Sequence, residues 1–465
     1  MISYEQLARL VASAPSDLVL PGGDRRAAVT VSAPLALVDA VDLGDGRWVA
    51  VVVDDDDDRW TVPLLVEDSG LRRANPGDGV AERLVAALAD VRLARHELRG
   101  AATLAGRAVE GSGPFVADAW HVEDVTGERA ITVDQTNESV VVGERVVVKW
   151  AVRLPREGVL GSQPAGERLG ALMAQQFDGI PRSWGLLWFV DHVHGSSLLL
   201  ASLAELIPGG DDGWDWAVED LRRLDRGDID LDAALAPAKR LGTLIARLHV
   251  ALAATGRHAA DDRLVAHWQA RAYDDLDEAV RVVEGDEGTR LRARAGRIAS
   301  SFDAFAACVG TPLIAVHGDL HVGQVLRFSD PHDYVVTDFD GNPVLPPEER
   351  STPQPAALDV VGMLASLDHV GRIVIKRTDG ADEVVVRGWI EAAQEAFLHD
   401  YRDTLALSGH GDLLDERLLA PLRLQQEVRE LLYAERHLPL WRYAPDGALV
   451  DLLPDLPAPA DTTEE

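Results

Sequence analysis

The sequence predicts an α+β protein with two lobes, the first rich in strands and the second mainly helical. Its 465 residues exceed what one hydrophobic core usually organises. The first part alternates short apolar runs with turns, as strands do. From about residue 232 onward, apolar residues recur at the spacing of helices. We therefore expect a β-rich region followed by a helical one.

Composition bounds the class of protein before any motif is considered. Hydrophobic residues make up 47% and charged residues 26%, the balance of an ordinary globular chain. The net charge of −32 argues against nucleic acid or an anionic membrane surface as a partner, because both would be repelled. One cysteine, Cys308, allows no intrachain disulfide, and the first residues lack the pattern of a signal peptide. Apolar runs are too short for a membrane span. We expect a cytoplasmic protein with small, cationic or metal-bridged ligands.

The first elements are short strands, expected at 35–41, 47–53 and 60–67. The acidic run 54–58 lies between two of them. It lacks the Gly and Glu spacing of a calcium-binding loop, so we interpret it as a solvated hairpin turn. Apolar positions at helical spacing predict a helix over 81–99.

A second β segment follows. Residues 133–150 contain two β-branched runs joined by a Gly-containing turn, which predicts a hairpin that ends near Lys149. A helix that carries Glu167 and a strand at 185–193 come next, and the Gly- and Asp-rich stretch 208–213 marks a lobe boundary. We expect four regions, which are a β-rich cap, a strand-rich lobe, a helical lobe and a disordered Pro- and acid-rich tail, over residues 1–90, 91–205, 206–452 and 453–465.

Two apolar runs that flank a polar loop carry the sharpest chemical signal. The chain reads IAVHGDLHVGQVL over 314–326, and YVVTDFDGNP follows over 334–343. Phosphoryl transfer from ATP needs a carboxylate that orients the acceptor hydroxyl and oxygen ligands that hold Mg²⁺ on the phosphates. Asp319 supplies the first, while Gln324, five residues later, and Asp338 supply the second. An ordinary turn aspartate is the alternative interpretation of Asp338.

This loop resembles that of the aminoglycoside-phosphotransferase branch of the eukaryotic-like kinases, H-G-D-x-x-x-x-N, with Gln324 in place of Asn. Together with DFDGNP and PAALDVVGML, it is most similar to actinobacterial maltokinases and, more closely, to glucosamine kinases. The resemblance covers roughly 133–445. It implies a bilobal kinase-like fold that uses ATP and Mg²⁺.

The resemblance also implies individual roles. Asp319 would be the catalytic base, with Gln324 and Asp338 as metal ligands. Lys149 would contact the phosphates and pair with Glu167. No Gly-rich loop is present, so other polar side chains of the hairpin would cover the phosphates by hydrogen bonding, namely Gln135, Asn137 and Ser139. We expect His317 to pack beneath the loop and Asp359 to accept its backbone N–H groups.

The acceptor site is expected near the C-terminus. A helix over 423–437 has one apolar face and one polar face, and the chain keeps the R-E-x-x-Y-x-x-R-H-x-P-x-W pattern of the sugar kinases. A carboxylate and an indole together suit a sugar. The expected acceptor residues are Glu430, Tyr433, Trp441, Asp340 and His321, although His321 could equally face the lobe interior. DFDGNP matches the glucosamine kinases better than the D-F-E-G-E-P of maltokinases, so we expect transfer to the 6-hydroxyl of D-glucosamine.

Other functions stay open at this point. Within the enzymes, a maltokinase and then an aminoglycoside phosphotransferase are the alternatives. A non-catalytic kinase-fold binding module is the alternative of another class. A protein kinase fits least, because no A-P-E segment follows Asp338. The sequence does not indicate an oligomeric state.

Overall fold

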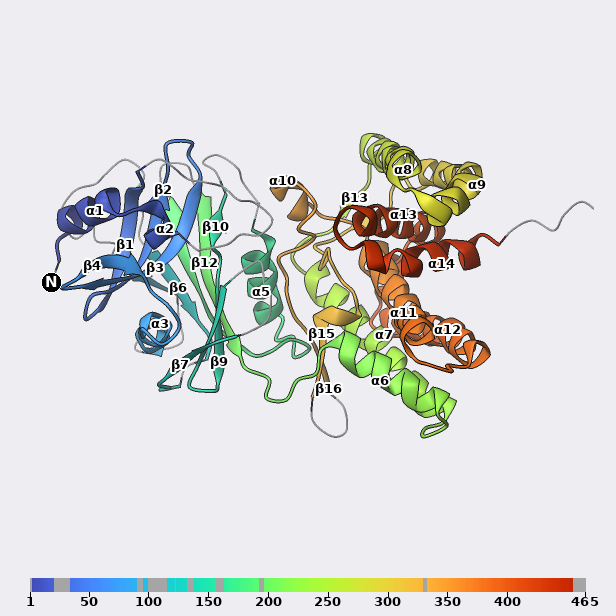
Figure 1. The fold of residues 1–465 in the computed structure, drawn as a ribbon, viewed down its shortest axis with the longest axis horizontal. Helices are drawn as coiled ribbons and strands as arrows, with labels where there is room; N and C mark the ends of the chain where they lie inside the picture. The colour runs from blue at the N-terminus through green and yellow to red at the C-terminus, as the bar shows by residue number, and fades with distance from the viewer. Residues whose placement is uncertain are drawn as a thin grey trace, which may run out of the picture. The chain divides into compact units, whose positions relative to one another are not determined.

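The computed structural model forms two compact units (Figure 1). The first comprises Met1–Met173, Ile180–Pro208 and Pro343–Ser351, and the second comprises Ala174–Gly179, Gly209–Asn342 and Thr352–Glu465. The structure describes residues 2–20, 34–89, 95–98, 115–121, 123–131, 138–155, 163–191, 196–328 and 333–454. The predicted α+β class is confirmed. The predicted tail lies, from residue 455, outside the described residues.

The first unit contains a five-stranded antiparallel sheet. Its strands are β1(Ala36–Gly44), β2(Arg47–Val53), β3(Arg59–Glu67), β4(Gly70–Arg73) and β10(Arg153–Leu154). The three strands expected in this region are therefore confirmed. The acidic run between β2 and β3 forms a turn, in which the Asp54 carboxylate accepts the backbone N–H groups of Asp56 and Asp58. The hairpin interpretation is confirmed.

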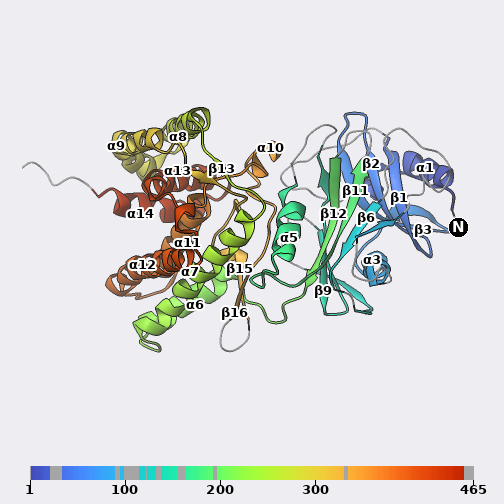
Figure 2. The same ribbon diagram turned by 180° about the vertical axis from the view of Figure 1, so that it is seen from behind.

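A seven-stranded antiparallel sheet lies in the same unit. Its order is β5(Arg95–Leu98), β6(Phe115–Ala119), β11(Ser183–Asp191), β12(Ser196–Glu205), β9(Val146–Trp150), β8(Glu138–Val142) and β7(Glu128–Ala130). The described residues of this unit form the helices α1(Tyr4–Ser13), α2(Ser16–Val19), α3(Val80–Ala89), α5(Pro164–Ala174) and the single turn α10(Pro347–Arg350). Figure 2 shows α5 and the strands of this sheet from behind.

One predicted element is wrong in part. The helix expected over 81–99 ends at Ala89, and Arg95–Leu98 is the strand β5. The backbone of β5 pairs with β6, where Leu98 lies opposite Phe115. Pairing with a strand distant in sequence therefore decides this segment against its helical pattern of apolar residues.

The strand β2 connects two hydrophobic cores. Successive side chains of a strand point to opposite faces. Val49 and Val51 belong to a core that also contains Phe115 and Trp150, which are residues of the seven-stranded sheet. Trp48, the neighbour of Val49, belongs to a second core that contains residues of α1. The five-stranded sheet thus packs one face against the seven-stranded sheet and its opposite face against the N-terminal helix α1. We did not predict α1 from the sequence.

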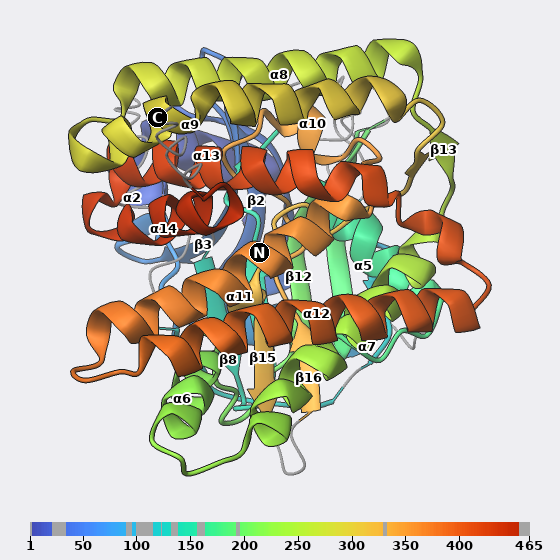
Figure 3. The same ribbon diagram turned by 90° about the vertical axis from the view of Figure 1, so that its right-hand side faces the viewer.

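The second unit is a helical assembly, whose helices are labelled in Figure 3. Its helices are α6(Gly213–Asp225), α7(Leu231–Ala253), α8(Asp262–Val282), α9(Gly285–Phe302), α11(Ala357–Arg377), α12(Glu383–Leu407), α13(Leu419–His437) and α14(Tyr443–Leu452). Short 3-10 turns are η1(Asp303–Ala307), η2(Val322–Gln324), η3(Gly411–Leu413), η4(Glu416–Leu418) and η5(Pro439–Trp441). A two-stranded antiparallel sheet of β13(His258–Ala259) with β14(Pro312–Leu313) and a β-hairpin of β15(Val325–Phe328) with β16(Asp333–Val336) complete it.

Close helix contacts in this unit depend on small residues. A Cβ atom on Gly242 of α7 would lie 2.3 Å from the carbonyl oxygen of Phe397 on α12, so only glycine permits this approach. Sequence patterns predicted α7 and α13 but missed α6, which begins after its N-cap Asp212. Among the described residues, no helix combines the length and apolar character needed to cross a membrane.

Candidate active site

The predicted catalytic loop lies in the second unit, between β14 and the β15–β16 hairpin. Gln324 ends the turn η2, immediately before β15. The hairpin register pairs Val325 with Val336, and the N–H of Thr337 donates to the carbonyl oxygen of Gln324 at 2.9 Å. Asp338 follows Thr337 directly. The two predicted metal ligands therefore lie at the same end of one hairpin.

Asp338 has an unusual backbone conformation. Its φ is +64°, in the left-handed region that Asp and Asn tolerate better than most residues. The chain turns here as it leaves β16, and the next side chain, Phe339, is buried against the ring of His317 with centroids 4.9 Å apart. The Asp338 side chain itself is exposed. An exposed carboxylate on a fixed turn suits a metal ligand better than a core residue.

Asp359 of α11 fixes the backbone of the loop through hydrogen bonds. Its carboxylate accepts the backbone N–H groups of His317 at 2.7 Å and Gly318 at 2.8 Å, as predicted. The imidazole of His249 lies 3.0 Å from the same carboxylate. Burial raises the pKa of Asp359, but the hydrogen bond and charge of His249 and the bonds from the loop outweigh it, so the pKa is lowered overall. Asp359 is therefore a stable buried anion.

His317 is also a support, as expected. Its side chain is fully buried, and Nε2 lies 2.8 Å from the carbonyl oxygen of Thr337. Because Nε2 must donate to a carbonyl, Nδ1 is left to accept the N–H of Asp319 at 3.4 Å. His317 thus links Asp319, the predicted base, to the hairpin end at which the predicted metal ligands lie.

Asp319 lies among carboxylates. Burial raises the pKa of Asp319 to about 7, and the negative charges of Asp338 and Glu430 act in the same direction. The predicted base is therefore electrostatically close to a predicted metal ligand on one side and a predicted acceptor residue on the other. A pKa near neutrality is typical of groups that handle protons in enzymes.

His321 turns inward from the loop. Its Nδ1 accepts the N–H of Gly323 at 3.1 Å, and burial lowers the pKa of His321 to about 4, so the ring is neutral. Trp214, in the first turn of α6, stacks on this ring with centroids 5.9 Å apart. We did not predict Trp214 as a site residue. The signal available was its place two residues after a helix N-cap, Asp212.

Three of the predicted acceptor residues, Glu430, Tyr433 and Trp441, lie on α13 and the turn η5 that follows it. Glu430 accepts a hydrogen bond from Gln426 at 3.0 Å, and burial raises the pKa of Glu430. Trp441 meets Trp214 edge-to-face, with ring centroids 5.9 Å apart. Because Trp214 also stacks on His321, one aromatic side chain connects the catalytic loop with the end of α13. Tyr433, by contrast, packs on His437 at the exposed end of the helix.

The remaining predicted residues are placed less tightly. Asp340 is partly exposed, two residues after Asp338. In the first unit, β9 carries Lys149, and Ser139 on β8 lies directly opposite it. Glu167 is an exposed residue in the first turn of α5, and its pairing with Lys149 stays a prediction. The other two expected phosphate contacts lie outside the described residues, Gln135 and Asn137.

A magnesium site at the hairpin is compatible with the residues present. Within the described parts of the chain, no group of three His, Cys, Asp or Glu side chains could hold a metal ion by itself. Mg²⁺ usually takes only one or two protein oxygens and completes its shell with water and substrate phosphates. The amide oxygen of Gln324 and the carboxylate of Asp338 are such a pair.

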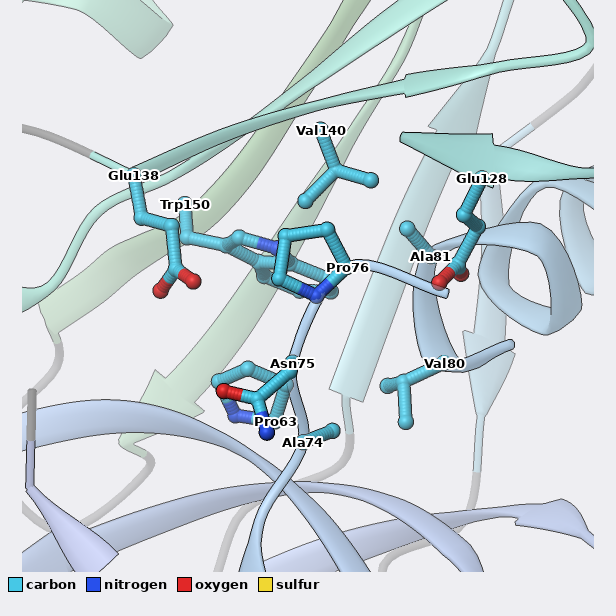
Figure 4. Close-up of a pocket in the computed structure, with 10 residues that line it drawn as sticks. All are labelled: Pro63, Ala74, Asn75, Pro76, Val80, Ala81, Glu128, Glu138, Val140 and Trp150. Carbon is cyan, nitrogen blue, oxygen red and sulfur yellow. The ribbon is translucent and has the colours of Figure 1, made fainter. Parts of the chain in front are cut away.

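A pocket in the first unit is too small to compete as a site. It is lined by residues that include Glu138, Trp150 and Pro76 (Figure 4). Its free volume of about 10 Å³ holds no more than one water molecule. Glu138 is paired with Arg73 there, so the pocket is part of the packing between the two sheets.

Comparison with known proteins decides the family. No family model matches the chain. A glucosamine kinase of Streptacidiphilus jiangxiensis is 55% identical over 447 residues, which are 96% of this chain and 98% of that protein. The chain belongs to the glucosamine kinase family. A second glucosamine kinase, of Mycolicibacterium smegmatis, is 39% identical over 90% of this chain and 98% of its own length. The resemblance of the loop and hairpin motifs to this family is confirmed.

Solved glucosamine kinase structures share the fold over nearly the whole length. One, in complex with glucosamine, ADP and inorganic phosphate, has a TM-score of 0.84 and 52% identity, covering 96% of this chain and 99% of its own. Another crystal form of a glucosamine kinase has a TM-score of 0.86. Because 96% of this chain is covered, the match includes most of the first ninety residues, for which the motifs alone predicted no relationship.

Proposed function

We propose that this chain transfers the γ-phosphoryl group of ATP to the 6-hydroxyl of D-glucosamine, giving glucosamine 6-phosphate and ADP. One observation carries the proposal from the structure. Burial raises the pKa of Asp319, and the negative charges of Asp338 and Glu430 raise it further, so the base lies within electrostatic reach of both the metal side and the acceptor side of the reaction. The complex reported for a related glucosamine kinase contains glucosamine and ADP, which supports the choice of substrates.

The metal would be held by Gln324 and Asp338. Mg²⁺, when bound there, would neutralise the charge that develops on the phosphate oxygens during transfer. The hydrogen bonds of Thr337 keep the two ligands on one rigid hairpin end, because Thr337 bonds to both Gln324 and His317. Lys149, on the β8–β9 hairpin of the first unit, would contact the phosphates.

The acceptor would be oriented rather than strongly activated. Asp319 in its ionised form accepts the hydrogen bond of the 6-hydroxyl and points that oxygen at the phosphorus. Glu430 takes the ammonium group of the amino sugar, and the indole face of Trp441 covers the C–H surface of the ring. His321, being neutral and fixed by Gly323, adds a hydrogen-bonding or stacking wall without a competing positive charge.

An acceptor panel tests this function. Purified protein is incubated with ATP and Mg²⁺ and with glucosamine, glucose, maltose or kanamycin, and ADP release is measured. Phosphate position is then located by ³¹P–¹H NMR. Phosphate at C6 of glucosamine supports the proposal. Phosphate at C1 of maltose would show that the acceptor is maltose, as in a maltokinase. Absence of ADP release with every acceptor would overturn the proposal altogether.

A further inference from the structure

His369 occupies a central position beneath the expected acceptor site. It lies on α11, and only 4% of its surface is exposed. Its Nε2 is 2.9 Å from a carboxylate oxygen of Glu427, which lies on α13 one turn before Glu430. Its ring meets Trp441 at right angles, with centroids 5.8 Å apart. The imidazole therefore contacts both elements that carry the acceptor residues.

A buried charged network holds His369 in place. Glu427 is completely buried, and its second oxygen accepts a hydrogen bond from Arg423 at 3.1 Å. Arg423 in turn faces Asp368 at 3.7 Å, and Asp368 binds Arg372 at 2.6 Å. Such a network is costly to desolvate and gives little stability over apolar packing, but it fixes side chains in one geometry when every member is paired.

We propose that His369 is a positioning residue of the acceptor site, which is held by Glu427 and in turn orients the indole of Trp441 and supports the charge of Glu430. The inference rests on the proposed function, because it concerns how the same site selects an amino sugar. His369 has no direct role in the chemistry. It acts through the two side chains that would touch the acceptor.

Electrostatics supports the geometry. Burial lowers the pKa of His369, but the charge and hydrogen bond of Glu427, with smaller effects of Glu430 and Asp368, raise it overall. Burial raises the pKa of Glu430 overall, and the charge of His369 offsets part of that rise. His369 therefore favours the ionised form of Glu430. An ionised carboxylate in a partly buried site attracts an ammonium group more strongly than it does a neutral sugar hydroxyl.

Two substitutions separate the contacts. His369→Phe keeps a ring against Trp441 but removes the charge and the bond to Glu427. His369→Gln keeps a donor for Glu427 but removes the ring. The control is Asp451→Asn, at the outer, half-exposed end of the same network, where Asp451 binds Arg372 at 2.6 Å. This control perturbs the network without contacting Trp441 or Glu430 in any described interaction.

Steady-state kinetics with glucosamine and with ATP gives the decisive comparison. We expect His369→Phe to raise KM for glucosamine about tenfold and to change kcat and KM for ATP less than about threefold. His369→Gln should recover part of the loss, and Asp451→Asn should leave KM unchanged even where it lowers the thermal midpoint. A loss confined to kcat, or an unchanged KM for glucosamine in either His369 variant, would overturn the inference.

Thermal unfolding and wild-type activity keep the outcomes distinct. If His369→Phe is too unstable to assay, the Gln variant with calorimetric binding of glucosamine in the presence of ADP decides, and unaltered affinity overturns the inference. Wild-type protein that ignores glucosamine but phosphorylates another sugar would instead refute the proposed function. The His369 variants would then be judged by the KM of that sugar.

Discussion

His249 and Asp359 form a fully buried pair, with His249 Nε2 3.0 Å from Asp359 Oδ2. The other ring nitrogen of His249 lies 2.7 Å from the hydroxyl of Tyr401. Side chains from three helices, α7, α11 and α12, thus meet at the carboxylate that accepts hydrogen bonds from the predicted catalytic loop. The loop geometry therefore depends on the packing of the helical unit.

Asp359→Asn should cost stability and activity together. The amide keeps one acceptor oxygen but replaces the other by a donor that faces the N–H groups of the loop or the ring of His249. We expect a loss of about 3 kcal/mol in the free energy of unfolding and a fall in kcat. Urea denaturation measures the first. Asp403→Asn, at an exposed position on α12, is the control and should change neither.

The pH dependence of that loss has a definite sign. The folded-state pKa of Asp359 lies below its ordinary value of 3.8. Its contribution to stability is therefore fully present above about pH 4 and is lost as the pH falls through the lowered folded value. The stability difference between wild type and Asp359→Asn should be constant from pH 8 to 5 and shrink below about pH 4. A difference that grew on acidification would contradict the assignment.

Asp319→Asn should abolish turnover while leaving nucleotide binding intact. The same change should stabilise the ligand-free protein. The pKa of Asp319 is about 7, above its ordinary value of 3.8, so the ionised form is disfavoured in the folded state. The cost develops between about pH 4 and pH 7 and is fully present above pH 7.

We expect the variant to be more stable than wild type by about 1–2 kcal/mol at pH 8, and the gain to vanish near pH 4. Urea denaturation without nucleotide or Mg²⁺ at both pH values measures it. Normal turnover by the variant, in a coupled ADP assay, would remove Asp319 from the role of base. Lower stability at pH 8 would instead contradict its electrostatic environment.

Gly323→Ala tests the contact between the loop and α6. An added Cβ would lie 2.5 Å from Nε1 of Trp214 and 2.9 Å from Cε1 of His321, so one ring must move. We expect kcat/KM for the acceptor to fall at least about tenfold with the fold retained, as far-UV circular dichroism would show. Gly296→Ala, with open space around the new methyl group, is the matched control. Equal kinetics for the two variants would exclude the Trp214 contact from function.

Glu430→Gln tests recognition of the ammonium group. A carboxylate–ammonium hydrogen bond in a partly buried site is worth about 1.5–3 kcal/mol, so KM for glucosamine should rise roughly ten- to a hundredfold. The affinity for ADP should not change. Glu391→Gln, on the exposed face of α12, is the control. If the Glu430→Gln variant kept its affinity for glucosamine in calorimetry, another carboxylate would bind the ammonium group.

Sequence reasoning was strongest where the chemistry is local. Asp319, Gln324 and Asp338 are joined by one loop and one hairpin, so their proximity follows from two short apolar runs and the turn between them. His249 and His369 were missed as site residues because no local pattern marks them. Their partners lie 110 and 58 residues away, Asp359 and Glu427, and only the packing of helices brings them together.

The strand β5 illustrates the same limit for the fold. Its apolar residues fit a helix, and the competing interaction is a backbone ladder with β6 that the local pattern does not encode. Trp214 is similar, because its ring meets His321 and Trp441 from elements more than a hundred residues further along the chain. The division of the strand-rich part at residue 90 stays a prediction.

The interior shared by the two sheets of the first unit limits how this chain can diverge. Val49, Phe115 and Trp150 fill one space from three separate stretches of sequence. Recombination that exchanged only the first ninety residues with a distant relative would leave half of that space lined by side chains shaped for another partner. We expect crossovers between natural relatives to be rare within residues 36–205, and expect the N-terminal segment and the β8–β9 hairpin to be inherited as one block.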